Sequence, residues 1–184
     1  MNLPNKLTVL RVFMIPLFLV LYFLGQFFWA FVVFALASLT DMLDGMIARK
    51  YNLVTDFGKL MDPLADKLLT ISAFICLLSR HPLGDTFGLV MLILIISREL
   101  IVTSIRLIAA EKGIVIAADR WGKLKTISQM VWICWEFLIR VRGLENISAL
   151  LMPLGNALLI VVVLLTVGSG VNYIVKNRAL LKDM

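Results

Sequence analysis

Residues 38–67 read SLTDMLDGMIARKYNLVTDFGKLMDPLADK, and this stretch decides both the fold and the chemistry that we expect. It sets four aspartates, Asp41, Asp44, Asp62 and Asp66, in or beside runs of apolar residues. A charged side chain at the centre of a membrane helix costs about 2.5–3.5 kcal/mol on the insertion scale. The four carboxylates therefore need partners that neutralise them.

The first half of the stretch has helical spacing. At about 100° per residue, one face of a helix carries five of its residues: Asp41, Asp44, Gly45, Ala48 and Arg49. This pattern predicts a helix with one polar, partly small-residue face in an otherwise apolar surface.

The second half of the stretch predicts another helix. Asp62 and Asp66 are four residues apart and lie one above the other on a helix. Pro63 fits the first turn of that helix, with Asp62 as its N-cap. A short segment joins the two helices, so we expect them to be antiparallel neighbours whose aspartates converge.

The whole chain has the composition of a membrane protein. Of its 184 residues, 61% are hydrophobic, whereas a soluble domain has about 45–50% apolar residues. Several apolar runs reach the length of about 18 residues that a membrane helix needs. We expect an all-α integral membrane bundle of about six transmembrane helices, preceded by an N-terminal amphipathic segment, in a single domain over residues 1–184. The expected spans are near residues 7–24, 27–50, 63–78, 87–110, 127–138 and 147–175.

The basic residues predict the orientation. With the N-terminus inside, all 18 Lys and Arg residues except Arg80, Arg140 and Arg142 lie on or toward the inner side. We therefore expect a multi-pass protein of the cell membrane with both termini and the active site in the cytoplasm. The net charge of +6 suits membrane lipids with anionic headgroups and anionic substrates. A nucleic-acid partner is not expected, because no soluble basic module is present to bind it.

The aspartates indicate metal binding. Four converging carboxylates repel one another unless cations lie between them, and ligation by oxygen alone favours Mg²⁺ or Mn²⁺ over zinc. Four carboxylates suit two ions, and paired metals orient a phosphoryl group and stabilise its developing charge. The alternative is a pair of helices held together by salt bridges from the aspartates to Arg49, Lys59 and Lys67.

The second half of the chain has a basic set of its own. Arg98 and Arg106 are two helical turns apart, and Lys123 and Lys125 follow near the start of the next helix. Together they suggest a phosphate-binding site, although a regular helix would point the two lysines apart. The alternative is that they anchor the inner side of the helices, with Glu99 pairing a neighbouring arginine.

A resemblance follows from the acidic stretch. It matches the pattern D-x₂-D-G-x₂-A-R-x₈-G-x₃-D-x₃-D, and this pattern resembles the signature of the CDP-alcohol phosphatidyltransferase family. The matching residues are Asp41, Asp44, Gly45, Ala48, Arg49, Gly58, Asp62 and Asp66. The resemblance implies six membrane helices, a homodimer and an active site at the inner face.

The resemblance also implies roles for the residues. Asp41, Asp44 and Asp62 would bind the metals. Asp66 would bind the second metal and act as the general base, taking the proton of an acceptor hydroxyl that attacks the β-phosphorus of CDP-diacylglycerol. The nucleotide end of this lipid would be surrounded by Gly45, Ala48, Arg49 and Gly58. Spacing alone does not assign the base to Asp66 rather than to Asp62.

Three softer motifs point to the acceptor. PNKLTVLR at residues 4–11, RELIVTSIRL at 98–107 and WGKLKT at 121–126 resemble family members that use sn-glycerol 3-phosphate. Asn5 and Thr8 would then help to bind CDP-diacylglycerol, and the basic set would bind the phosphate of the acceptor. An inositol phosphate acceptor remains the alternative within the family, and a divalent-cation transporter remains the alternative outside it. The first motif would equally suit a helix at the membrane interface, with Arg11 at the headgroups.

Overall fold

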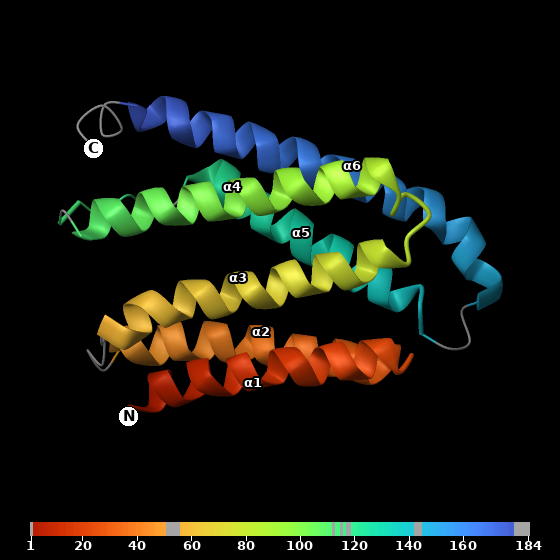
Figure 1. Ribbon diagram of the computed structural model, residues 1–184, viewed down its shortest axis with the longest axis horizontal. Coiled ribbons are helices and arrows are strands. Elements are labelled where there is room, and N and C mark those ends of the chain that lie inside the picture. Colours follow the sequence, from red (N-terminus) through yellow and green to blue (C-terminus); the bar gives the residue numbers. More distant parts are fainter. Residues whose placement is uncertain are drawn as a thin grey trace. The chain divides into compact units, whose positions relative to one another are not determined.

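The computed structural model describes residues 2–50, 56–111, 113–114, 116, 119–141 and 145–178. This part of the chain contains helices and no strand, so the predicted all-α class is correct (Figure 1). The helices are α1 (Leu3–Phe23), α2 (Phe27–Lys50), α3 (Asp56–Ser79), α4 (Thr86–Glu111), α5 (Arg120–Leu138) and α6 (Glu145–Lys176). They form two compact units, Met1–Ser79 and Arg80–Met184.

The helices have the lengths and composition of a membrane bundle. Within the described residues, three segments are long and apolar enough to cross a membrane: Asn5–Phe23, Thr86–Glu111 and Leu150–Lys176. The other helices have 24, 24 and 19 residues, which corresponds to about 36 and 28 Å at 1.5 Å per residue. These three helices carry the acidic stretch and part of the basic set, which lowers their hydropathy. The expected all-α membrane bundle is confirmed.

In the first unit, α1 packs against both α2 and α3 (Figure 1). Phe18 and Tyr22 of α1 and Phe34 of α2 are buried, and the ring centroid of Phe18 lies 6.2 Å from that of Tyr22 and from that of Phe34. The Tyr22 hydroxyl donates a hydrogen bond to the carbonyl of Cys76 on α3, at 2.6 Å. The apolar face of α1 packs against both helices, and this hydrogen bond adds a polar contact to α3.

The turn between α1 and α2 depends on a glycine. Gly25 has φ of 75°, a conformation that costs glycine little and other residues more. The Gln26 N–H donates to the Leu21 carbonyl at 2.9 Å and the Gly25 N–H to the Tyr22 carbonyl at 3.0 Å. This is the Schellman pattern that ends many helices.

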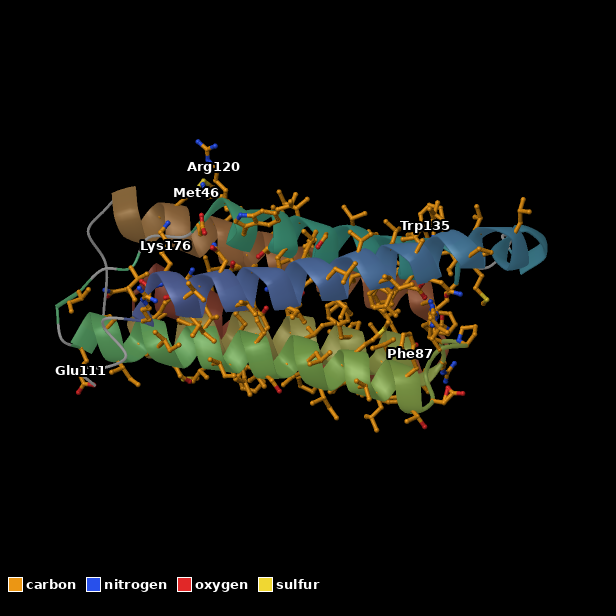
Figure 2. The ribbon with its side chains drawn as sticks, turned by 90° about the horizontal axis from the view of Figure 1, so that it is seen from above. Met46, Phe87, Glu111, Arg120, Trp135 and Lys176 are labelled. Atoms are coloured by element: carbon orange, nitrogen blue, oxygen red, sulfur yellow. The ribbon has the colours of Figure 1, made fainter. Side chains whose placement is uncertain are left out.

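In the second unit, α6 packs against α4 and α5 (Figure 1). The Trp132 indole of α5 donates to the Gly155 carbonyl of α6 at 3.2 Å. Figure 2 shows Glu111, Arg120 and Lys176 at one end of this unit and Trp135 at the other. Helix α5 therefore runs in the opposite direction to α4 and α6.

One helix boundary differs from the prediction. Helix α3 begins at Asp56, so Asp62 lies inside the helix and the expectation that it caps the helix is wrong. Pro63 is accommodated within the helix, where it lacks only the N–H that would bond to the carbonyl four residues earlier. The acidic residues of α3 are thus held by helix on both sides.

Candidate active site

The first unit brings a buried arginine to the acidic stretch. Arg11 of α1 is fully buried, and its Nη1 lies 2.7 Å from Oδ1 of Asp41 on α2. A buried guanidinium is costly unless it is paired, so this contact explains how Arg11 is tolerated inside an apolar unit. The expectation that Arg11 could lie at the lipid headgroups is wrong in this structure.

A second contact joins α1 to the acidic face of α3. The hydroxyl of Thr8, which is also fully buried, donates a hydrogen bond to Oδ1 of Asp62. Thr8 and Arg11 are three residues apart and lie on the same face of α1. Asn5, one turn earlier, is buried as well. The polar face of α1 therefore reaches aspartates on both neighbouring helices.

Asp66 lies one turn beyond Asp62 on α3, and its nearest cation is local. The Nζ atom of Lys67 lies 2.7 Å from Oδ2 of Asp66, and both side chains are partly exposed, at 26% and 32%. Partly exposed ion pairs contribute little to stability. Asp66 is thus partly accessible, as a group that exchanges a proton with a substrate must be.

The other residues of the signature are only partly described. Asp44, Gly45, Ala48 and Arg49 lie on α2, but their side chains are outside the described part of the structure. Gly58 lies in the first turn of α3 and is buried. We call Asp41, Asp44, Asp62 and Asp66 the acidic set.

The donor chemistry of the acidic set fits hard divalent cations. Arg11 and Thr8 each contact one oxygen of an aspartate, and a carboxylate accepts on both of its oxygens. Carboxylates are the ligands that Mg²⁺ and Mn²⁺ prefer. Within the described residues, no three His, Cys, Asp or Glu side chains are arranged to hold a metal ion. The binding of two ions by the acidic set stays a prediction.

The second unit contains the predicted basic residues, and one buried glutamate lies closer to one of them than to another. Glu99 is buried and forms an ion pair with Lys125, which is 2% exposed. Arg98 lies farther from the same carboxylate oxygen, with its Nη1 at 3.5 Å. The Nε atom of Arg98 is buried and has no hydrogen-bond partner in the structure. Glu99 therefore neutralises Lys125 and leaves Arg98 with unused hydrogen-bonding capacity.

Arg106 and Lys123 have different surroundings. The guanidinium of Arg106 lies over the ring of Tyr173 on α6, 5.4 Å from its centroid, a distance typical of a cation–π contact. Its Nε atom is also buried and without a hydrogen-bond partner. Lys123, by contrast, is exposed while Lys125 is buried. The two lysines point apart, as regular helical spacing predicts. From here on, the basic set means Arg98, Arg106 and Lys125, without the exposed Lys123.

A third group of charges lies away from the signature. Glu136 of α5 is fully buried and forms an ion pair with Arg140, four residues further along the chain. His81 accepts a hydrogen bond from the Leu83 N–H at 3.1 Å and lies 3.5 Å from Oε1 of Glu136. We call His81, Glu136 and Arg140 the turn cluster.

Sequence reasoning missed two contacts on α6. Tyr173 supports Arg106, and the backbone at Gly170 lies against the side chain of Arg98. Both belong to a small and polar run at residues 168–173 in an otherwise apolar helix. That break in hydropathy was the available signal.

Comparisons with known proteins agree with the signature. A family model described as CDP-alcohol phosphatidyltransferase matches residues 1–168. A Bacillus subtilis protein named CDP-diacylglycerol–glycerol-3-phosphate 3-phosphatidyltransferase is 40% identical, over 98% of this chain and 97% of its own length. A Rickettsia typhi protein of the same name is 36% identical, over 94% of each chain. A Mycobacterium tuberculosis protein named probable phosphatidylglycerophosphate synthase is 40% identical, over 95% of this chain and 81% of its own length.

Proposed function

The chain belongs to the CDP-alcohol phosphatidyltransferase family, and we propose that it transfers the phosphatidyl group of CDP-diacylglycerol to sn-glycerol 3-phosphate. The products are phosphatidylglycerophosphate and CMP. As a member of this family, the chain is a membrane-bound transferase of phospholipid biosynthesis. The names of its relatives, which match over nearly their whole length, support the choice of acceptor.

One observation carries the assignment of the active site. The two helices that bear the family signature are joined through the polar face of α1, where Arg11 contacts Asp41 and Thr8 contacts Asp62. Buried polar side chains that converge on carboxylates are costly to maintain in an apolar protein. Their presence supports a functional role for this acidic set rather than a purely structural one.

We assign two divalent cations, Mg²⁺ or Mn²⁺, to Asp41, Asp44, Asp62 and Asp66. When bound, the ions supply charge stabilisation for the phosphoryl group in transfer. Arg11 and Thr8 hold Asp41 and Asp62 in fixed orientations, so the carboxylates are preorganised and need little rearrangement during the reaction. Gly45, Ala48, Arg49 and Gly58, with Asn5 and Thr8, are assigned to the binding of CDP-diacylglycerol.

Asp66 is assigned as the general base. It takes the proton from a hydroxyl of the acceptor as the hydroxyl oxygen forms a bond to the β-phosphorus of CDP-diacylglycerol. The bond between this phosphorus and the oxygen that bridges to the α-phosphate breaks, and CMP leaves with that oxygen. The partial exposure of Asp66 supports this role, since the base must meet an acceptor that arrives from water.

The basic set is assigned to the phosphate of the acceptor. Arg98 and Arg106 each have a buried Nε–H without a hydrogen-bond partner, and arginine binds phosphate through paired hydrogen bonds. Lys125 adds positive charge but is neutralised by Glu99, so the two arginines carry most of the recognition. The exposed Lys123 contributes only to the general positive potential.

The proposal also covers the assembly of the protein and its location in the cell. The chain acts as a single domain over residues 1–184 and as a homodimer in the cell membrane, with both termini and the active site in the cytoplasm. The distribution of basic residues supports this orientation, since only Arg80, Arg140 and Arg142 fall on the outer side.

An acceptor panel tests the proposed function. Purified protein receives CDP-diacylglycerol and Mg²⁺ together with glycerol 3-phosphate, inositol phosphate, serine, inositol or phosphatidylglycerol. CMP release and the lipid product are followed. We expect turnover with glycerol 3-phosphate, which is lost on chelation of the metal and restored by Mg²⁺ or Mn²⁺. A preference for inositol phosphate would reassign the acceptor, and no CMP with any acceptor would favour a cation transporter.

A further inference from the structure

The side chain of Arg98 lies against α6 at Gly170, a residue without a side chain. A methyl group built on Gly170 would lie 2.9 Å from Cγ of Arg98 and 3.9 Å from both its Cβ and its Nε. Contacts below about 3.0 Å are not tolerated without movement, and Cγ is too near the backbone to move easily. The side chain of Arg98 can therefore keep its present conformation only because residue 170 is glycine.

The far end of the same side chain approaches a second glycine. A methyl group on Gly122 of α5 would lie 3.9 Å from Nη2 of Arg98, which is an ordinary van der Waals contact. Gly170 thus restricts the stem of Arg98, while Gly122 leaves room at its tip. The carboxylate of Glu99, 3.5 Å from Nη1, adds an electrostatic restraint on the guanidinium.

Glycine at this position needs a reason. In the interior of a helix, glycine is about 1 kcal/mol less favourable than alanine. Residue 170 lies well inside α6, where alanine would satisfy the helix. Contact with Arg98 provides the reason. Alanine would displace the guanidinium of Arg98, whose Nε–H has no hydrogen-bond partner in the structure.

We infer that Gly170 is a positioning residue for acceptor recognition: it admits the stem of Arg98 against α6 and so directs the guanidinium to the phosphate of the acceptor. This inference rests on the proposed function, in which Arg98 binds that phosphate. Gly170 touches no substrate and acts only through Arg98. Its replacement therefore alters the binding of the phosphate-bearing acceptor and leaves the binding of CDP-diacylglycerol and the chemical step unchanged.

The test compares Gly170→Ala with Gly168→Ala, two substitutions on the same helix. A methyl group on Gly168 would meet nothing within 4 Å, so this variant has the same gain in helix propensity and no clash. For Gly170→Ala we expect the KM for glycerol 3-phosphate to rise about ten- to a hundredfold, as expected for a displaced binding group. The KM for CDP-diacylglycerol and kcat should stay within about twofold of the wild-type values, since one group has moved and no reacting group has. Gly168→Ala should match the wild type in all three.

A double variant separates positioning from general damage. In Arg98→Ala the Cγ atom is absent, so alanine at position 170 meets no close neighbour on α4. We expect Arg98→Ala with Gly170→Ala to behave like Arg98→Ala alone, which is the non-additivity of residues in contact. If Gly170→Ala alone cannot be purified in folded form, the double variant should restore the folded protein.

Three results would overturn the inference: equal behaviour of Gly170→Ala and Gly168→Ala, a similar rise in both KM values, or additive effects in the double variant. Failure of the proposed function has a different signature. In that case the wild-type protein itself would release no CMP with glycerol 3-phosphate, whatever residue stands at position 170.

Discussion

The acidic set of the first unit and the basic set of the second unit manage buried charge in opposite ways. In the first unit, Arg11 and Thr8 each approach one carboxylate oxygen, and the remaining charge is negative. In the second unit, Glu99 neutralises Lys125, and the remaining charge is positive. In an apolar protein such an excess is costly wherever it is buried, and a ligand of opposite charge would offset that cost. The comparison agrees with the proposal of cations at one set and a phosphate at the other.

The turn cluster shows what a self-contained group of charges looks like. Glu136 has no exposed surface and two basic neighbours, Arg140 and His81. A methyl group on Gly155 would lie 2.7 Å from its Oε1, so α6 closes over the carboxylate. This cluster leaves no excess charge for a ligand, and we interpret it as structural.

Substitution in the acidic set should have the largest effect. Asp66→Asn keeps the size of the side chain but removes the base, and we expect the rate of CMP release to fall about a thousandfold. Asp62→Asn should give a comparable loss through metal binding. The matched control is Asp85→Asn, because Asp85 is exposed beside the start of α4 and asparagine caps a helix equally well. Near-normal turnover in either active-site variant would contradict the assignment of the acidic set.

Substitution in the basic set should affect one substrate only. Arg106→Ala removes a charged hydrogen-bond donor worth about 1.5–3 kcal/mol, so we expect the KM for glycerol 3-phosphate to rise about ten- to a hundredfold. The KM for CDP-diacylglycerol should not change. Steady-state kinetics with each substrate varied in turn would check this, and equal effects on the two substrates would argue against a phosphate site.

Substitution in the turn cluster should affect stability and not catalysis. Glu136→Gln leaves Arg140 without its counter-charge, and breaking a buried pair costs about 3–5 kcal/mol. We expect a lower thermal unfolding temperature in detergent. The kcat per folded molecule should match that of the wild type. A kcat that falls while the unfolding temperature stays constant would assign this cluster a catalytic role.

The smallest effect is expected at the exposed lysine. Lys123→Ala should change the KM for glycerol 3-phosphate by no more than about twofold, because exposed charges are screened by solvent. Lys125→Ala is the informative comparison, since Lys125 is buried and its loss removes the ion pair that it forms with Glu99. If both lysines behaved alike, the difference in their burial would have no functional meaning.

Much of this molecule is predictable from local pattern. Apolar runs predicted the helices, and the rotation of about 100° per residue in a helix predicted that Lys123 and Lys125 would point apart. The ion pair of Glu136 with Arg140 likewise joins residues four apart in the chain. These predictions succeed because they depend on helical periodicity, which neighbouring residues determine among themselves. The beginning of α3 was predicted seven residues too late, because a proline usually belongs to the first turn and here lies within the helix.

By itself, the sequence determined the membrane class, the family signature and the residue types that suit metal and phosphate. Only the tertiary structure decided which charges remain in excess. Arg11 contacts Asp41 across 30 positions of the chain, and Glu99 lies closer to Lys125 than to Arg98. Contacts of this kind depend on how helices pack, and packing brings together residues whose separation in sequence carries no periodic signal. The contact between Gly170 and Arg98 is of the same kind, because it is visible only when α6 lies against α4.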